Sequence, residues 1–371
     1  MKSDPKGNKQ KLFAAIIIAI VLILTIGIAV SGWQNEPQDA ITPPPQSDNE
    51  AEDKTEDENK NNNGDGKEDE GAKPEIKYIN YLTGLQISEN IFQKKPYAFL
   101  VSTNAPTYGI STSDLFIEIP TEKGDTRFLM YSSDISSMEK IGAFAPTRDY
   151  ISQLTKAFGG ILVAKGCDDL FEYNSIASTL SLDLSKNQKY TFVENSSEVY
   201  SSDALIEELL TNEKIDTELI KKISIPYVFA AEESTVVGKA SASVITLPYA
   251  PSNNTSLIFN SKTNRYTLMK NGSEKIDMLT GEAAEFTNAV ILFADSTTYE
   301  KSEGVRTVIN TLAEGRGYYA TGGKLIEIKW YADESGNLSF TTLSGEILTV
   351  NRGNFYIGYY KSSEAGSVTF K

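Results

Sequence analysis

The feature that most constrains this chain is an uncharged apolar run close to its N-terminus. Residues 12–32 have the sequence LFAAIIIAIVLILTIGIAVSG, and the next charged residue is Glu36. Twenty-one helical residues span about 31 Å, which matches the hydrocarbon core of a bilayer. Four lysines within residues 1–11 precede the run, and acidic residues follow it. Because positive flanks stay on the cytoplasmic side, we expect a single-pass anchor in the cell membrane, a cytoplasmic tail at 1–11 and an extracytoplasmic body.

A cleaved signal peptide is the alternative for this segment, because Ala29-Val30-Ser31 offers small residues for cleavage. The apolar region of a signal peptide usually has about 7–15 residues, and residues 12–32 exceed that length. The length therefore favours an uncleaved anchor. The bulk of the chain is exported in either case, and a lipid-modified anchor is excluded because no cysteine follows the run.

Residues 33–76 are predicted to be a disordered acidic linker. The part from 33 to 75 carries 14 acids and four lysines, with Pro43-Pro44-Pro45 near its start. Such a segment has too few apolar groups to offset the entropy of ordering. A flexible coil of this length has a mean span of about 35–40 Å. We expect it to act as a spacer between the anchor and a folded body.

The whole chain contains no histidine and a single cysteine, Cys167. Without an imidazole, Ser–His–Asp and Cys–His catalytic sites are impossible. Histidine-ligated zinc, iron and copper sites and an internal disulfide are excluded in the same way. Residues 76–371 carry a net charge of −8 and show no basic stripe with interleaved aromatic residues. We therefore expect no nucleic-acid partner, no metal centre and no cofactor.

From residue 77 to residue 231 the pattern predicts a mixed α/β domain. Short apolar runs of strand length lie at 97–101, 115–119, 127–131 and 161–164. Apolar residues recur at helical spacing over 150–158 behind Thr147, and over 204–210 behind Ser201 and Ser202, which offer N-caps. Strands mixed with helices indicate two packed layers around one core.

Helical periodicity nearly disappears after Ala240, and residues 240–371 are predicted to form a mostly antiparallel β domain. Strand-like segments lie at 257–259, 266–269, 289–293, 324–331, 338–342, 347–350 and 355–360. Pairs such as Asn271-Gly272 and Gly322-Gly323 separate them as turns. With a joint predicted at 232–239, the expected fold class is α+β: transmembrane helix, disordered linker, mixed α/β domain and β-rich domain.

A series of short motifs runs through both halves in a specific order. In the first half they are Leu82-Thr83-Gly84-Leu85, Lys95-Pro96-Tyr97-Ala98, Gly109-Ile110-Ser111 and Thr126-Arg127-Phe128-Leu129. In the second half they are Asn271-Gly272, Thr280-Gly281-Glu282 and Asn288-Ala289-Val290. In these motifs, from about residue 80 to about residue 360, the chain resembles the YerB-like family of bacterial lipoproteins. The resemblance implies a mixed N-terminal and a β-rich C-terminal domain outside the cytoplasmic membrane, without an established activity.

The chain departs from the family pattern at positions that carry functional groups in relatives. Ala145 stands in place of the first of two arginines, and Ala164 stands in place of a histidine. Lys275 and a residue near Glu194 replace two further histidines, and Leu268 replaces an arginine. If those groups form a reactive or metal site in relatives, the resemblance implies that this protein has lost it. The anchor differs too, with a transmembrane segment in place of a lipid-modified cysteine.

Five charged residues that match the family pattern are the ligand-binding candidates: Asp114, Glu118, Glu122, Arg127 and Arg148. An arginine beside carboxylates can bind an anionic ligand or hold a carboxylate ionised. The alternative is a structural cluster of ion pairs that fixes a strand edge and a helix start, because such pairs perturb charges as readily as functional ones do.

The sequence favours a non-catalytic binding or scaffold protein of the cell envelope, with a cell-wall component or an envelope protein as its partner. The alternative is a carboxylate-dependent enzyme that acts on an envelope polymer, because two carboxylates can cleave a glycosidic bond without histidine. The adjacent pairs Asp168-Asp169 and Glu207-Glu208 point apart on a helix and indicate solvated faces. A pocket with acids about 5–10 Å apart would favour the enzyme, and an apolar patch would favour the binding protein.

Overall fold

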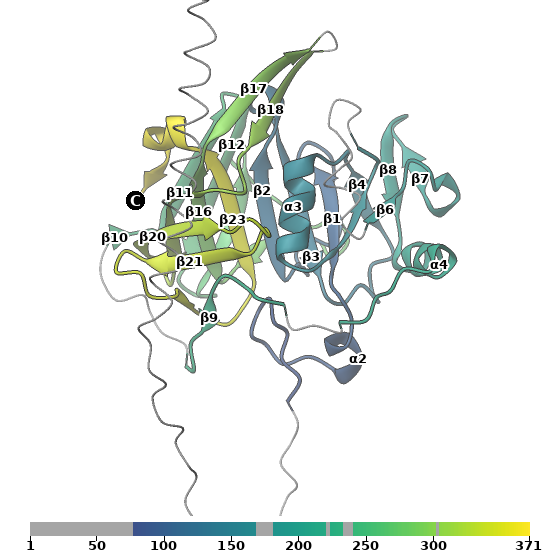
Figure 1. Ribbon diagram of the computed structural model, residues 1–371, viewed down its shortest axis with the longest axis horizontal. Coiled ribbons are helices and arrows are strands. Elements are labelled where there is room, and N and C mark those ends of the chain that lie inside the picture. The colour runs from purple at the N-terminus through teal and green to yellow at the C-terminus, as the bar shows by residue number, and fades with distance from the viewer. Residues whose placement is uncertain (1–76, 168–180, 220–222, 233–239, 302–303) are drawn as a thin grey trace, which may run out of the picture. The chain divides into compact units, whose positions relative to one another are not determined.

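The strands of the folded body form one large sheet and a smaller sheet that packs against it (Figure 1). The computed structural model describes residues 77–167, 181–219, 223–232, 240–301 and 304–371. These residues belong to one compact unit, which spans residues 72–371.

The predicted anchor at 12–32, the linker at 33–76 and the joint at 232–239, apart from Glu232, lie outside the described residues. Anchor and linker therefore stay predictions. Within the described part of the chain, none of the helices is long and apolar enough to cross a membrane.

The main sheet has 14 strands in the order β10-β20-β19-β16-β23-β2-β3-β1-β4-β8-β7, with β21 paired to β20 and with β5 and β6 continuing from β1. Its strands are β1 (Tyr97–Ser102), β2 (Leu115–Pro120), β3 (Thr126–Ser132), β4 (Ile141–Phe144), β5 (Ile161–Ala164), β6 (Ser181–Asp183), β7 (Phe192–Glu194), β8 (Glu198–Ser201), β10 (Ala240–Ser241), β16 (Asn288–Ala294), β19 (Glu314–Thr321), β20 (Lys324–Ala332), β21 (Leu338–Thr342) and β23 (Phe355–Lys361).

The second sheet has six strands in the order β14-β13-β12-β11-β24, with β15 also paired to β13. They are β11 (Val244–Ala250), β12 (Asn253–Asn260), β13 (Arg265–Lys270), β14 (Ser273–Glu274), β15 (Glu285–Phe286) and β24 (Thr369–Phe370). Two separate pairs complete the strands: the hairpin β17 (Ser296–Lys301) with β18 (Gly304–Ile309), and β9 (Val228–Phe229) with β22 (Thr349–Val350).

Helices are few in the described residues. The α-helices are α2 (Glu89–Phe92), α3 (Asp149–Ala157) and α4 (Asp203–Glu213), and the 3-10 turns are η1 (Glu122–Gly124), η3 (Gln188–Tyr190) and η4 (Ser362–Ser367). The α4 helix begins as predicted, because the Ser202 side chain caps it by accepting a hydrogen bond from the Leu205 amide at 3.3 Å. The β-rich character of the body is as expected, whereas helix is a minor part of its first half.

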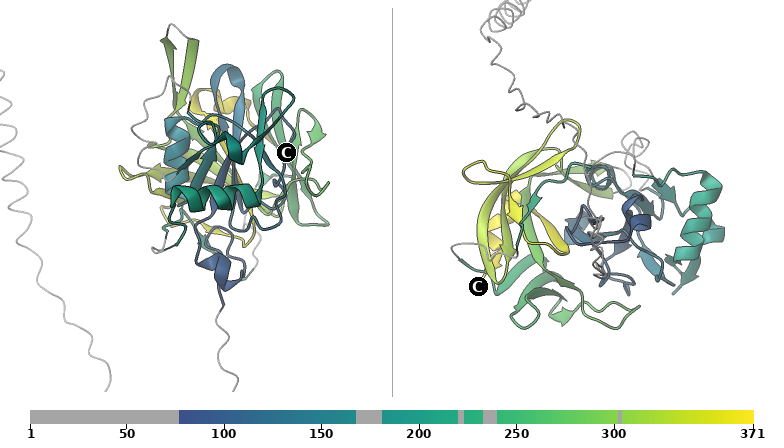
Figure 2. Two further views of the ribbon diagram at one scale, coloured as in Figure 1. Left: turned by 90° about the vertical axis from the view of Figure 1, so that its right-hand side faces the viewer. Right: turned by 90° about the horizontal axis from the view of Figure 1, so that it is seen from below.

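Strand alternation divides the apolar side chains between two cores, one on each face of the main sheet. On β1, Phe99 belongs to the core under the second sheet and α4, whereas Leu100 belongs to the core under α3. The α3 helix and the second sheet therefore lie on opposite faces of the main sheet. Figures 1 and 2 show α4 at one end of the body and β20 and β21 at the other.

The two chain segments that the sequence predicted as domains share the main sheet. Strand β23, from the C-terminal segment, lies between β2 and β16 and pairs with both in parallel. All six residues of β2 are buried, which is expected for a central strand. The two segments are therefore joined by backbone hydrogen bonds as well as by side-chain packing.

Two hairpin turns follow the predicted chemistry. Asn271 and Gly272 connect β13 to β14 with φ of 51° and 81°, and Gly322 and Gly323 connect β19 to β20 with φ of 56° and 72°. A type I′ turn requires positive φ at both central residues, and this requirement explains why asparagine and glycine occupy these positions.

Candidate functional site

The five charged residues that the sequence singled out are spread along β2 and its neighbours. Asp114 immediately precedes β2, Glu118 lies within it and Glu122 follows it in η1. At about 3.3 Å per residue, Asp114 and Glu118 are about 13 Å apart along the strand. Arg127 lies on β3, and Arg148 is the N-cap residue of α3. The structure therefore does not bring these five side chains together in one cleft.

Glu118 is fully buried and fully hydrogen-bonded. One carboxylate oxygen accepts from the Thr126 hydroxyl at 2.7 Å, from the Thr255 hydroxyl at 3.1 Å and from the Lys270 ammonium group at 2.5 Å. The other oxygen accepts from Thr255 at 2.9 Å and from the Tyr356 hydroxyl at 2.8 Å. We call these five residues the Glu118 network. Since three of them come from β12, β13 and β23, the network ties the first half of the chain to the second.

A second lysine, Lys275, lies beside the Glu118 network. Its ammonium group donates to the main-chain carbonyl of Ala105 at 3.1 Å. The ring of Phe128 is close to both lysines, with its centroid 5.6 Å from Lys270 Nζ and 5.7 Å from Lys275 Nζ. The pKa of Lys275 is lowered to about 8, chiefly by burial and also by the charge of Lys270, whereas Glu118 opposes the shift.

The two arginines form separate ion pairs. Arg148 binds Glu122 through two hydrogen bonds, from Nε at 3.2 Å and from Nη2 at 2.7 Å, and the arginine side chain is 6% exposed. Arg127 binds Asp125 at 2.5 Å. The first pair has the fork geometry that arginine and carboxylate favour, and it fixes the start of α3 against η1. Whether these residues also bind a ligand stays a prediction.

The Asp114 carboxylate fixes a neighbouring loop through hydrogen bonds rather than facing a space large enough for a ligand. One carboxylate oxygen accepts from the Ser133 main-chain amide at 2.7 Å. Burial raises the pKa of the Asp114 carboxyl, and hydrogen bonds with Ser133 and Asn80 partly counteract that rise. Asn80 donates to the Ser133 hydroxyl at 3.2 Å, which links Asp114 to the first described segment of the chain.

Asp277 joins the two halves in the same manner, although it was not among the candidates. It is fully buried and accepts from the main-chain amides of Gly109 at 3.0 Å and Ser111 at 2.9 Å. It also accepts from the Ser111 hydroxyl at 2.6 Å and from the Leu279 amide at 2.8 Å. Its sequence context, an acid before a Thr-Gly turn, marks a turn residue but gives no sign of the long-range partner.

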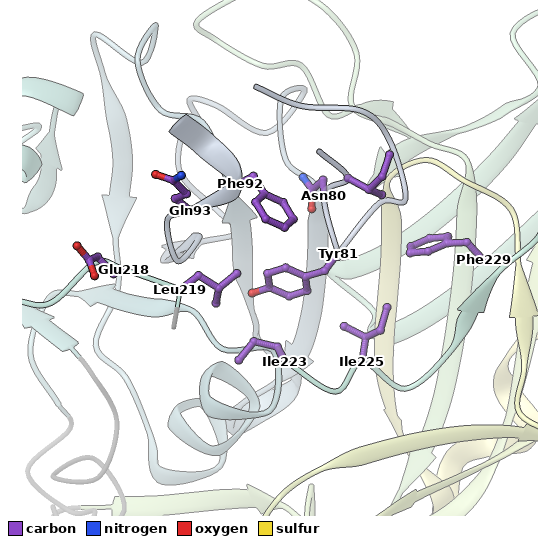
Figure 3. Close-up of a pocket in the computed structure, with 10 residues that line it drawn as sticks. Asn80, Tyr81, Phe92, Gln93, Glu218, Leu219, Ile223, Ile225 and Phe229 are labelled. Atoms are coloured by element: carbon purple, nitrogen blue, oxygen red, sulfur yellow. The ribbon is translucent and has the colours of Figure 1, made fainter. Parts of the chain in front are cut away.

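An apolar pocket of about 940 Å³ opens on the described part of the body (Figure 3). It lies between the segment 79–93 and the described residues 218–219 and 223–229, which are distant in sequence from that segment. Its apolar lining consists of Ile79, Tyr81, Phe92, Leu219, Ile223, Ile225 and Phe229, and its polar lining consists of Asn80, Gln93 and Glu218. Figure 3 shows the Tyr81 ring in the middle of this group, with Phe92 and Leu219 on one side and Phe229 on the other.

Specific contacts hold the two walls of the pocket. The Leu219 amide donates to the Gln93 carbonyl at 2.7 Å, and the Tyr81 hydroxyl donates to the Phe158 carbonyl at 2.8 Å. Gly84 has a φ of 69°, and a Cβ there would lie 2.7 Å from the Phe229 ring. Glycine is therefore required at this turn both by the backbone conformation and by the close approach of Phe229.

The polar groups of the pocket differ in exposure and in whether partners within the protein already occupy them. The Asn80 side chain is engaged, because its amide donates to Ser133 and its oxygen accepts from the Leu82 amide at 2.9 Å. Glu218 and Gln93 are exposed at the edge. Glu218 is the one charged residue among the ten that line the pocket. An apolar chamber with polar groups at one edge suits a ligand that has an apolar body and a polar end.

The apolar pocket itself is poor in acidic side chains. Among the described residues, no group of three or more acidic or cysteine side chains is placed to hold a metal ion. The pocket contains one acid, and glycosidic acid–base chemistry needs two across the scissile bond. No local sequence pattern indicates the pocket, because its residues are ordinary aliphatic and aromatic positions drawn from two distant segments.

These features define a β-rich protein in which two successive domains are built on one continuous sheet. The chain belongs to the family described as protein of unknown function (DUF3048): the N-terminal domain of that family matches residues 82–218 and the C-terminal domain matches residues 245–357. The resemblance to the YerB-like family is thereby confirmed, with both domains present.

The crystal structure of YerB protein from Bacillus subtilis is similar in fold. It superposes with a TM-score of 0.68 at 20% sequence identity, and the match covers 79% of this chain and 99% of the YerB chain. No protein with curated annotation matches the chain.

Proposed function

We propose that this protein is a membrane-tethered, extracytoplasmic binding protein of the cell envelope, without catalytic activity, and that the apolar pocket is its ligand site. Residues 12–32 supply the anchor, and residues 33–76 supply a spacer of about 35–40 Å. The body at the end of the spacer would meet apolar groups of envelope components, either of the cell wall or of an envelope protein.

The observation that carries the proposal is the contrast between satisfied charges and an open apolar chamber. The carboxylates of Glu118 and Glu122 are occupied by partners within the protein, so they have little capacity left for a substrate. The pocket, in contrast, keeps the Phe92 ring 42% exposed. A volume of about 940 Å³ lies in the range of about 300–1,000 Å³ that small-molecule sites occupy.

Binding at the pocket can be tested with a neutral hydrophobic dye, Nile red, and the fragment 77–371, which lies within the compact unit that spans residues 72–371. Phe92→Ala should weaken dye binding about tenfold, because an exposed aromatic wall contributes much of the apolar contact. Leu343→Ala is the matched control, since this side chain is 50% exposed but lies outside the pocket. Equal effects of both changes, or no dye binding at all, would remove the pocket from the proposal.

Tethering and orientation need a separate experiment on the full chain. Protease added to intact protoplasts should degrade residues 33–371, because lysines flank one end of the apolar run and acids flank the other. Protection of that region, with cleavage confined to the first dozen residues, would reverse the orientation.

A further inference from the structure

A second pocket lies beside α2. Phe92 lines the apolar pocket, whereas Asn90 and Ile91 line this one. It is formed by the segment 88–97, the loop 133–136 and the start of α4, and we call it the polar pocket. Its volume of about 460 Å³ lies in the range of about 300–1,000 Å³ that small-molecule sites occupy.

Three carboxylates of the polar pocket each have one oxygen held by the protein. Asp134 and Asp203 accept from main-chain amides at 3.0 Å and 2.7 Å. Glu207 accepts from the hydroxyl of Tyr97 at 2.7 Å. The second oxygen of each carboxylate has no hydrogen bond or ion pair with another described residue. These side chains are therefore held in position and keep three acceptors for a ligand.

The polar pocket also contains donors without partners. The Lys94 ammonium group, the Asn90 amide and the Ser136 hydroxyl form no side-chain hydrogen bond or ion pair with the rest of the described chain. Ile91 and Ile135 add apolar surface to the same lining. Free acceptors, free donors and apolar carbon are thus combined in one small space.

From this set of groups we infer that the polar pocket binds a saccharide. A sugar ring carries a hydroxyl group on most of its carbons, each of which donates and accepts, and its C–H faces are apolar. One compact ligand can therefore give a donor to each free carboxylate oxygen, accept from Asn90 and Lys94, and contact Ile91. A peptide backbone supplies only one donor per residue, and a phosphate group presents acceptors where the carboxylates need donors. The inference concerns a site other than the apolar pocket and does not depend on ligand binding there.

Binding is tested with two neutral disaccharides, cellobiose and N,N′-diacetylchitobiose. Each is titrated against the fragment 77–371 and followed by saturation-transfer difference NMR. At least one of them should bind, and its affinity should not change with salt concentration, because a neutral ligand has no charge to screen.

Two variants assign the binding to the polar pocket. Asn90→Ala should weaken it about fivefold, the effect of one lost hydrogen bond. Asp134→Asn replaces a free acceptor by a donor and should weaken it about tenfold, because a hydrogen bond to a charged group is stronger. Gln93→Ala is the matched control: it removes an exposed amide beside Asn90 that lines the apolar pocket, and it should bind the disaccharide as the unaltered protein does.

Several results would overturn the inference. It is wrong if neither disaccharide binds, or if Asn90→Ala and Asp134→Asn bind as tightly as Gln93→Ala does. Binding of spermidine without binding of either disaccharide would mean that the carboxylates hold a cation instead. The Nile red assay separates the two pockets, because a saccharide in the polar pocket leaves the dye bound. Displacement of the dye by the disaccharide would place the sugar in the apolar pocket and contradict the inference.

Discussion

The Glu118 network and the apolar pocket are both built from segments that are far apart in sequence. They differ in whether their charged groups have partners within the protein. In the network every oxygen of Glu118 has a donor, and the carboxylate is shielded from water. In the pocket the one carboxylate, Glu218, is exposed at the edge and has no side-chain hydrogen bond or ion pair with another described residue. A buried carboxylate that is fully hydrogen-bonded stabilises or specifies a structure, whereas an unpaired one beside an apolar chamber can interact with a ligand.

The difference follows from where each region lies in the fold. Glu118 sits on β2, which pairs with β3 and β23 and is covered by the second sheet, so an unpaired charge there would be very costly. The pocket lies where the first described segment meets residues 218–219 and 223–229, outside the main sheet. Charged residues in the core must therefore find partners within the protein, and charged residues at the pocket edge need not.

The largest effect should come from breaking the Glu118 network. Glu118→Ala leaves the Lys270 ammonium group without its carboxylate and removes the acceptor of three hydroxyl groups. We expect the free energy of unfolding to fall by about 3–5 kcal/mol, the typical cost of removing one partner of a buried ion pair. Urea denaturation of the fragment 77–371 measures this loss.

A double variant sharpens the test. Glu118→Met with Lys270→Met removes both charges and should recover part of the loss, because a buried pair can often be replaced by apolar side chains. A loss below about 1 kcal/mol for Glu118→Ala would mean that water reaches the network and that the contrast with the pocket is wrong.

Arg148→Ala should have the next largest effect on stability. Its two hydrogen bonds to Glu122 are charge-assisted and almost buried, so the variant should lose about 2–3 kcal/mol. Arg316→Ala is the matched control, because its side chain is 75% exposed and its pair with Glu327 should contribute nothing measurable. Capture of envelope material, normalised to folded protein, should not change. A loss of capture without a loss of stability would show that Arg148 binds a ligand.

The stability of the protein should rise between pH 8 and pH 9.5 because of Lys275. Its pKa is lowered to about 8 by burial, whereas an unfolded lysine has a pKa of about 10.4. In this window the unfolded state binds more protons than the folded state, so the free energy of unfolding increases with pH, by about 2 kcal/mol at most. Denaturation at several pH values measures the slope, and Lys275→Met should flatten it. Equal slopes for the two proteins would contradict the burial of this charge.

Much of the fold could be predicted from the sequence because strand patterns and turn chemistry are local. The segments 97–101, 115–119 and 161–164 lie in β1, β2 and β5, and the Gly322-Gly323 turn lies where its chemistry placed it. The parallel pairing of β23 with β2 could not be predicted, because it joins residues more than 200 positions apart and no local pattern specifies it. For the same reason the continuity of the sheet across the two segments was not foreseen.

The candidate site residues show the same limit: their identity could be predicted from the sequence, but their long-range partners could not. Glu118 and Arg148 could be singled out from the sequence because they match the charged positions of the family pattern. Their partners, Lys270 and Glu122, come from other strands and turns, so the sequence alone did not distinguish a structural pair from a ligand site. The pocket was invisible for the opposite reason, because Tyr81, Phe92 and Ile225 resemble ordinary core positions.

Phe92→Ala has the smallest expected effect on stability, and it tests whether the wall of the pocket differs from the buried core. The ring is 42% exposed and contacts Tyr78 with centroids 5.4 Å apart, so its removal should lower the free energy of unfolding by less than about 1 kcal/mol. The same truncation at Phe99, which is fully buried, should cost about 3–5 kcal/mol.

If the pocket is the binding site, Phe92→Ala has the reverse profile of Arg148→Ala: dye affinity falls about tenfold while stability is nearly kept. Urea denaturation and dye titration on one preparation give both numbers. A Phe92→Ala protein as unstable as Phe99→Ala would mean that the ring is structural and that the pocket closes in solution. The contrast between the Glu118 network and the apolar pocket would then be wrong.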